Sequence, residues 1–389
     1  MSELNYLEKL LDGTEVEWKA LGDVTSVLRG KRLTKNLLSA EEKFPVFHGG
    51  LEPLGYYNKS NRPANTVMII NVGASAGTVG YSTVDFWSSD GCFCLEHNEL
   101  LNNRFLYFAL IGYQSLLKSK VRVAGIPTLD AIVVNKLLIP IPCPENPEKS
   151  LAIQSEIVRI LDKFTALTAE LTAELNMRKK QYNYYRDQLL SFKEGEVEWK
   201  TLGEVAQYSK TRISFELLDE RNYVGVDNLL QNRAGKSLSN HVPTSGKLTE
   251  FIPTDILIGN IRPYLKKIWQ ADCIGGTNGD VLVIRCIDSS INTRYLYQIL
   301  ADDKFFEYNM QHAKGAKMPR GSKEDIMKYP IPVPPLTLQA RIVEILNKFD
   351  TLTNSITEGL PREIELRQKQ YEYYRDLLFS FPKPETASN

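Results

Sequence analysis

The stretch "IQSEIVRILDKFTALTAELTAELNMRKKQYNYYRDQLLSF", Ile153 to Phe192, decides the fold, because its apolar side chains recur at spacings of three and four. The apolar positions are Ile153, Ile157, Ile160, Phe164, Leu167, Leu171 and Leu175. This spacing, kept for three heptads, is typical of a coiled-coil seam. A helix over 150–192 would be roughly 64 Å long at about 1.5 Å per residue. We therefore predict a helix that projects beyond any domain of ordinary size.

The same pattern occurs again near the C-terminus. "LQARIVEILNKFDTLT" (338–353) matches 153–168, and "QYEYYRDLLFSF" (370–381) matches 181–192. The second set of seam positions is Leu338, Ile342, Ile345, Phe349, Leu352, Ile356 and Leu360. Two such helices in one chain can satisfy each other, and we expect them to pair antiparallel.

The second copy contains a predicted break. Gln154 to Tyr182 covers 28 positions, whereas the matching Gln339 to Tyr371 covers 32. The longer copy also contains "EGLPRE" (358–363). Glycine and proline inside a helix interrupt or kink it, so we predict a break near Leu360.

Two further repeats frame the rest of the chain. "EVEWKALGDV" (15–24) returns as "EVEWKTLGEV" (196–205), and "IPIP" (139–142) returns as "IPVP" (331–334). The stretches between them, about 21–140 and 202–332, share little sequence. The same frame with different contents predicts two modules that do one kind of job on different targets.

The N-terminus resembles the end of a long helix. "YLEKLLDGTEVEWK" (6–19) is similar to "YRDQLLSFKEGEVEWK" (185–200), so the body of this helix lies elsewhere in the chain. We expect residues 3–11 to pack beside the end of the C-terminal helix, 374–381, and to give the chain approximate two-fold symmetry.

The predicted fold class is α+β. Two mixed α/β globular domains are separated by two long antiparallel coiled-coil helices in a pseudo-two-fold arrangement. The predicted segments are an N-terminal stub (1–20), a first domain (21–142), a central helix (143–195), a second domain (196–334) and a C-terminal helix (335–389).

Composition excludes several classes of protein. The chain has 389 residues, 43% of them hydrophobic, and no apolar run approaches the roughly 18 residues that span a bilayer. The first residues are acidic and polar rather than signal-like, so we expect a cytoplasmic protein. The five cysteines suit reduced thiols, and we interpret Cys92 and Cys94 as two strand residues on one face rather than metal ligands.

Catalytic motifs do not emerge from the sequence. The Pro-Pro pair in "VPPL" (333–336) lacks the neighbours of an adenine or cytosine-N4 methyltransferase motif. "GASAGTVG" (73–80) lacks the Lys-Ser/Thr of a phosphate-binding loop and favours a strand-turn-strand. "EWK" (17–19 and 198–200) imitates a nuclease metal motif without an upstream aspartate, and the four histidines have no ligand spacing. We predict neither catalysis nor a metal site in this chain.

Positive charge is local, because the net charge is zero. Five basic residues face one acid over 104–136 and again over 304–323, shortly before each Ile-Pro exit. A charge run is usually a solvated face, but recurrence at equivalent places favours contacts with phosphates. With the basic segments 28–35 and 259–267, the DNA-binding candidates are Arg29, Lys31, Arg32, Arg104, Lys118, Lys120, Arg122, Arg262, Tyr264, Lys266, Lys267, Lys314, Lys317 and Arg320.

The helices carry two further sets of candidates. "QYNYYRD" (181–187) and its twin are too rich in tyrosine for a solvated helix end, so we interpret them half as core and half as a docking surface for another subunit. The docking candidates are Tyr182, Tyr185, Tyr371 and Tyr374. The tandem Thr-Ala-Glu-Leu repeat gives the spacer candidates Thr168, Leu171, Thr172 and Leu175.

Several of these segments resemble one known family. "IPIPCPENPEKSLAIQSEIVRILDKF", "LTAELTAEL" and "YRDQLLSFKEGEVEWKTLGE" are similar to specificity (S) subunits of type I restriction-modification systems, most of all to the IC subclass. The resemblance implies that the variable regions are target recognition domains, each reading one half of a bipartite, asymmetric DNA site. It also implies that the chain is not an enzyme.

The resemblance extends to partners and cofactors. It implies that the chain binds two modification subunits, which are adenine methyltransferases using S-adenosylmethionine, and through them ATP- and Mg-dependent restriction subunits. No cofactor is then expected on this chain, because base flipping and methyl transfer take place in the partner.

The tandem repeat suggests a ruler. One Thr-Ala-Glu-Leu unit adds about 6 Å of helix and rotates the remainder by about 40°, so we predict that the repeat sets the gap between the half-sites. Two alternatives remain open at this stage. The chain could be a coiled-coil scaffold with two protein- or peptide-binding domains, or a methyltransferase with an unrecognised motif.

Overall fold

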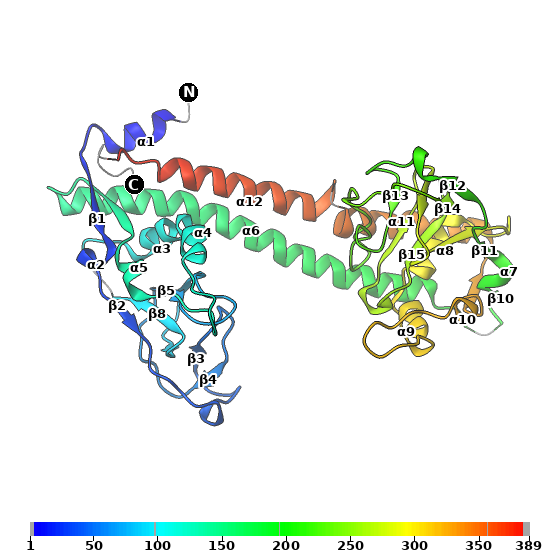
Figure 1. Cartoon of the computed structure of the whole chain (residues 1–389), viewed down its shortest axis with the longest axis horizontal. Helices are drawn as coiled ribbons and strands as arrows, with labels where there is room; N and C mark the ends of the chain where they lie inside the picture. The colour runs from blue at the N-terminus through cyan, green and yellow to red at the C-terminus, as the bar shows by residue number, and fades with distance from the viewer. Residues whose placement is uncertain (1–3, 97–98, 194, 356, 384–389) are drawn as a thin grey trace. The chain divides into compact units, whose positions relative to one another are not determined.

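A computed structural model describes residues 4–96, 99–193, 195–355 and 357–383. The predicted seam position Ile356 and the first residue of the predicted 3–11 stub lie outside these ranges. The chain divides into two compact units. Unit 1 comprises 1–167 with 367–389, and unit 2 comprises 168–366. Each unit therefore contains one variable domain and parts of both long helical segments (Figure 1).

The repeated entry and exit motifs form a small sheet that closes each domain. In unit 1, β1 (Val16–Ala20) pairs antiparallel with β9 (Leu138–Pro142), and Trp18 lies opposite Pro140. In unit 2, β10 (Glu198–Thr201) pairs with β19 (Pro330–Val333) in the matching register. Each sheet has only two strands, so every strand is an edge strand, where prolines are tolerated.

The first variable domain is built on a four-stranded antiparallel sheet. Its order is β2 (Val27–Arg29), β8 (Cys92–Leu95), β5 (Thr66–Ile70) and β6 (Val79–Ser82). Helix α3 (Asn103–Gly112) covers β5 and β6. The glycine-rich segment 73–80 contains the turn between β5 and β6, which confirms the predicted strand-turn-strand. Cys92 and Cys94 are buried two residues apart on β8, as predicted.

Smaller elements complete this domain. A second sheet has the order β4 (Gly55–Tyr57), β3 (Phe44–Phe47) and β7 (Trp87–Ser88). The short helices are α2 (Leu21–Val24), η1 (Lys35–Leu37), α4 (Gln114–Ser119) and α5 (Ala131–Asn135).

The second variable domain repeats the main sheet in a different sequence. Its order is β11 (Ala206–Tyr208), β18 (Val281–Cys286), β15 (Ile256–Gly259) and β16 (Ile268–Gln270), again antiparallel. Helix α8 (Thr293–Leu300) corresponds to α3, and the side chains of Asn102 and Asn292 cap the two helices in the same way. The two domains therefore share a fold although their sequences differ.

The remaining elements of unit 2 surround this sheet. A second four-stranded sheet has the order β12 (Arg212–Ser214), β14 (Lys247–Phe251), β17 (Gly275–Thr277) and β13 (Tyr223–Val224). The short helices are α7 (Leu202–Val205), η2 (Phe215–Leu217), η3 (Pro263–Leu265), α9 (Asp303–Gln311) and α10 (Lys323–Ile326).

The long helices follow the sequence repeats. Helix α6 (Pro147–Leu190) is continuous over 44 residues, as predicted. Its counterpart is broken into α11 (Leu336–Asn354) and α12 (Gly359–Leu378), which confirms the predicted interruption. Gly359 has φ +73, and a Cβ there would lie 2.4 Å from the carbonyl oxygen of Thr351. Only glycine fits this backbone without strain.

The predicted seam is correct only in part. Ile153 and Ile157 are buried, but Leu161, which is outside the predicted seam, is fully buried, and Leu167 is 37% exposed. The beginning of α6 packs on the first variable domain as well as on α12, so its buried face is not a strict coiled-coil stripe. Unit 2 shows the same shift, because Leu346 is fully buried at the position matching Leu161.

Ring contacts give the direction of the helix pairing. In unit 1, Phe164 near the beginning of α6 stacks on Tyr374 near the end of α12, with ring centroids 5.2 Å apart. In unit 2, Tyr182 and Tyr185 near the end of α6 stack against Phe349 of α11. The partners occur in opposite chain order, as antiparallel pairing requires.

The N-terminal helix lies beside the end of α12 (Figure 1). Leu7 and Leu11 of α1 (Leu4–Leu11) are buried in the same core as Leu378 and Phe381. The Tyr6 hydroxyl also donates a hydrogen bond to Glu156 of α6 at 2.8 Å. The predicted position of the N-terminal stub is confirmed for residues 4–11. Within the described ranges, no helix is long and apolar enough to cross a membrane.

Candidate nucleic-acid interface

The central strand of each variable domain leads into a short platform for a loop. In unit 1, the chain leaves β5 at Asn71, whose carbonyl accepts a hydrogen bond from the Leu129 amide at 2.9 Å. The amide of Gly73 donates to the Pro127 carbonyl at 2.9 Å, and Val72 bridges to Thr128. We call residues 122–128 loop A, and two backbone hydrogen bonds between Arg122 and Thr128 close it.

Unit 2 contains the same construction in other residues. After β15, the Asn260 carbonyl accepts from the Gly321 amide at 3.1 Å, and the Arg262 amide donates to the Pro319 carbonyl at 2.7 Å. We call residues 314–320 loop B, and two backbone hydrogen bonds between Lys314 and Arg320, both 2.9 Å, close it. Loops A and B therefore occupy equivalent places in the two domains.

Basic side chains of the 28–35 segment line a cavity that includes Val72, beside the base of loop A. A cavity of about 460 Å³ is lined by Arg29, Arg32, Lys35 and His48 together with Val72, the residue that bridges to loop A. Lys31 lies next to them on the chain and is exposed. Lys118, Lys120 and Arg122 are also exposed, at the end of α4 and at the beginning of loop A. The cavity thus places the 28–35 segment beside the strand end that holds loop A.

The basic residues at loop B come from the loop itself and from the segment that follows β15. Lys314, Lys317 and Arg320 are exposed in the loop, and Arg262 is exposed directly beneath it. Arg320 forms a salt bridge with Asp280 at 2.6 Å, which holds its guanidinium beside the loop. Tyr264, two residues after Arg262, is 49% exposed.

One predicted DNA-binding residue is buried in the fold, and two others form ion pairs within their domains. Lys267 is only 9% exposed, and its ammonium donates to the Val226 carbonyl. Burial lowers the pKa of Lys267, as expected of an ammonium removed from water. Lys266 forms a salt bridge with Asp303 at 2.7 Å. The prediction of DNA contact for Lys267 is therefore wrong. The sequence shows that the residue is positively charged, but it does not show that the side chain points into the fold.

Arg104 is the second of the ion-paired residues. Its guanidinium binds Asp162 of α6 at 2.8 Å and lies over the rings of Tyr81, Tyr107 and Phe108. Arg294, its counterpart on α8, binds Asn347 of α11 at 2.6 Å and Asp350 at 2.5 Å. These arginines join each variable domain to its long helix, and DNA contact by Arg104 stays a prediction.

We call this contact between a variable domain and its long helix the joint. A buried glutamine is part of the joint in both units. Gln154 accepts from the Asn102 amide at 2.8 Å and donates to the Leu100 carbonyl. Gln339 accepts from the Asn292 amide at 2.8 Å and donates to the carbonyls of Ser290 and Pro334. Sequence reasoning missed this joint. Its only signals are the matched glutamines of "IQSEI" and "LQARI" and the matched Asn-x-Arg at the two helix starts.

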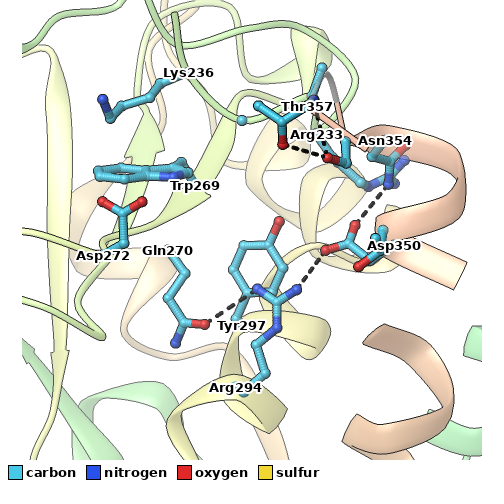
Figure 2. Close-up of a pocket in the computed structure, with 14 residues that line it drawn as sticks. Arg233, Lys236, Trp269, Gln270, Asp272, Arg294, Tyr297, Asp350, Asn354 and Thr357 are labelled. Carbon is cyan, nitrogen blue, oxygen red and sulfur yellow. Dashed lines mark hydrogen bonds and ion pairs between the residues drawn. The ribbon is translucent and has the colours of Figure 1, made fainter. Parts of the chain in front are cut away.

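In unit 2, a polar pocket of about 350 Å³ borders this joint. Arg294 lies against the Tyr297 ring and between Gln270 and Asp350, and Asp350 also accepts from Asn354 at the end of α11 (Figure 2). On the opposite wall, the Lys236 ammonium lies over the Trp269 ring. Most of these polar groups satisfy one another, so the pocket belongs to the joint. Across the described ranges, no cluster of histidine, cysteine and carboxylate residues could hold a metal ion.

Comparison with known proteins agrees with this duplicated construction. The family model for the type I restriction modification DNA specificity domain matches residues 14–178 and 194–366, one match for each repeat. The chain belongs to this specificity family.

Two curated relatives and one solved structure extend the comparison. The specificity subunit of the type I restriction enzyme EcoR124I/EcoR124II from Escherichia coli is 42% identical over the full length of both chains. The EcoprrI specificity subunit, also from Escherichia coli, is 34% identical over 92% of this chain and 93% of its own. The crystal structure of a type I S subunit from M. genitalium has the same fold, with a TM-score of 0.64, 19% identity and coverage of 96% and 98%.

The tyrosine-rich segments of this specificity-family chain divide between core and surface. Tyr182 is 2% exposed, and Tyr371 is also buried; burial raises the pKa of each to about 12. The prediction that these two offer a docking surface is therefore wrong. Tyr185 is 44% exposed, Tyr374 is half-buried, and the most exposed members are Tyr184 and Tyr373, at matching positions.

The Thr-Ala-Glu-Leu repeat lies within unbroken helix. Leu171 and Leu175 are half-buried, and the exposed Thr172 donates its hydroxyl to the Thr168 carbonyl, four residues earlier. The repeat therefore continues the helical spacing of α6 without a kink or a cap.

Proposed function

We propose that each variable domain of this specificity-family chain reads one half of a bipartite DNA site through the surface around loops A and B. The observation that carries the proposal is the duplicated platform, which presents basic residues at equivalent places in two domains of different sequence. Phosphate contacts position a protein on DNA without reading it, which suits a shared feature. The domains differ elsewhere, so the two half-sites differ and the site is asymmetric.

The long helices serve the complex in two ways. They hold the two domains at a set separation, and the Thr-Ala-Glu-Leu repeat at Thr168, Leu171, Thr172 and Leu175 fixes that separation. They also carry the docking surface for two modification subunits, which methylate adenine with S-adenosylmethionine. Restriction subunits that use ATP and Mg²⁺ join through these partners in the cytoplasm. The match to a relative named as a specificity subunit of a type I restriction enzyme supports this assignment.

Docking is centred on Tyr184 and Tyr373, because large exposed aromatic side chains are typical anchors of interfaces. Replacing both with alanine should weaken assembly with the modification subunit, measured by analytical ultracentrifugation. Tyr264→Ala, which removes a comparably exposed tyrosine beside loop B, is the matched control. Unchanged assembly of the double variant would move the docking surface elsewhere.

The DNA-reading role is tested by salt dependence. The complex with its modification subunit should bind duplex DNA with an affinity that falls steeply as salt rises. Replacing Lys314 and Lys317 with glutamine should reduce the slope of log K against log salt by about 2, roughly one for each lost phosphate contact. Lys348→Gln, on the exposed face of α11, should leave it unchanged. Salt-insensitive DNA binding would favour a scaffold for proteins instead.

A further inference from the structure

Loops A and B present apolar side chains to solvent. Val123 and Ile126 of loop A are 81% and 71% exposed, and Met318 of loop B is 50% exposed. Ile126 and Met318 occupy the same place, each directly before the proline that is bonded to the platform. Single exposed apolar residues are ordinary on a surface, but their recurrence at equivalent loop tips requires an explanation.

Backbone hydrogen bonds hold the loop tips in place, although the side chains at the tips are largely exposed. Each loop is closed by two backbone hydrogen bonds and tied to the strand end through its proline carbonyl. Gly125 and Gly315 have φ values of +83 and +100, which allow the tight turn. Because each tip is already ordered by its backbone hydrogen bonds, binding a partner costs it little conformational entropy.

The charge around the tips indicates which partner they meet. Lys118 and Lys120 precede loop A and Arg122 begins it, whereas Lys317 and Arg320 lie within loop B. Lysine is depleted in protein–protein interfaces. An apolar tip among exposed cations instead complements DNA, whose phosphates are anionic and whose stacked bases are apolar.

The two domains differ in sequence, so a feature that they share serves a step common to both half-sites. We propose that Ile126 and Met318 insert against the stacked bases and open a base step at each half-site. This inference rests on the proposed DNA-reading function. Apolar wedges are known to unstack base steps, and an opened step lowers the energy needed to extrude a target base.

The test uses the complete chain bound to its modification subunit. A duplex carries 2-aminopurine beside the methylated adenine of one half-site or the other, because the fluorescence of this base rises when it unstacks. One variant combines Val123→Ser with Ile126→Ser, and a second carries Met318→Ser. Each should abolish the fluorescence rise at the half-site of its own domain. We expect affinity to fall about tenfold, as lost apolar burial of this size implies, with an unchanged salt slope.

Ile132→Ser and Ile287→Ser are matched controls, since both remove exposed isoleucines outside the loops. They should leave fluorescence and affinity unchanged. If the loop variants keep the fluorescence rise, the wedge is excluded. If the loop variants keep the fluorescence rise but no longer bind the modification subunit, the loops dock protein instead. Failure of the unaltered complex to bind DNA would overturn the proposed function itself, which is a different result.

Discussion

At the scale of single residues, the joint between domain and helix depends on a few buried polar groups. Gln339 is fully buried, and its side chain hydrogen-bonds to one backbone amide and two backbone carbonyls. Gln154 has the same role in unit 1. These groups were not predictable, because a glutamine on an amphipathic helix is usually exposed. Only the packing of α3 or α8 against the helix buries it.

Gln339→Ala should therefore destabilise the protein. The change leaves one buried and two part-buried backbone groups without this partner, and a buried group left unpaired costs about 1 to 3 kcal/mol. We expect the free energy of unfolding, measured with urea, to fall by at least about 2 kcal/mol. Gln231→Ala, at an exposed loop position, should change it by less than about 0.5 kcal/mol. Equal effects of the two substitutions would show that the buried amide does not hold the joint.

A second residue-scale prediction concerns acid stability. Lys200 lies 2.8 Å from Asp288 and, with Ser290, holds the pKa of Asp288 at about 2, below its ordinary value of 3.8. A depressed carboxyl pKa stabilises the fold above the unfolded value and is lost as pH falls through the folded one. Asp288→Asn should thus lower stability at pH 6, and the difference from the unaltered protein should vanish between about pH 4 and pH 2.

The control for this pair is Glu198→Gln, which removes a more exposed carboxylate 4.0 Å from the same lysine. It should lower stability much less at pH 6, because exposed ion pairs contribute little. If the gap for Asp288→Asn is the same at pH 6 and pH 2, the salt bridge is not its cause.

At the scale of elements, sequence periodicity predicted the helices and their break well. The 44-residue α6 and the interruption before α12 follow from repeats and from Gly359 with Pro361, which act locally. The buried face was predicted less well. Leu161 rather than Leu167 is buried, because the face of a helix depends on everything that packs against it.

The break itself gives a prediction. Gly359→Ala would place a Cβ 2.4 Å from the Thr351 carbonyl at a residue with φ +73. We expect a loss of about 1 to 3 kcal/mol in the free energy of unfolding. Gly112→Ala is the matched control, since a Cβ there meets nothing within 4 Å at the end of α3. A neutral Gly359→Ala would mean that the break tolerates another backbone conformation.

Loops A and B occupy equivalent places in the two domains, although a comparison of their sequences does not reveal it. The two share only an alanine and a proline at matched positions, "RVAGIPT" against "KGAKMPR". Their equivalence comes from backbone hydrogen bonds to Asn71 and Gly73 in one domain and to Asn260 and Arg262 in the other. Backbone pairing requires little from side chains, so the sequences were free to diverge. The charge clusters were visible, but the loops that present them were not.

At the scale of the whole molecule, duplication is the organising fact. Each repeat supplies a closing sheet, a variable domain, a platform and a joint, and the family model matches once in each. The resemblance named the family correctly from the helices and the frame. It gave no account of which side chains face DNA, because the variable domains share the least sequence.

The central claim is that two domains read separate half-sites at a distance set by the helix between them. Inserting one more Thr-Ala-Glu-Leu unit after Leu175 adds about 6 Å of helix, and about one base pair of extra gap is expected where the rise is about 3.4 Å and the helices tilt. The deciding measurement is to sequence the methylated adenines in DNA from cells that carry this chain, or the insertion variant, with the modification partner. We predict that the insertion variant methylates adenines in the same two half-sites as the unaltered chain, and that the nonspecific spacer between these half-sites is about one base pair longer. A change in any recognised base, or one contiguous site for either chain, would contradict the claim.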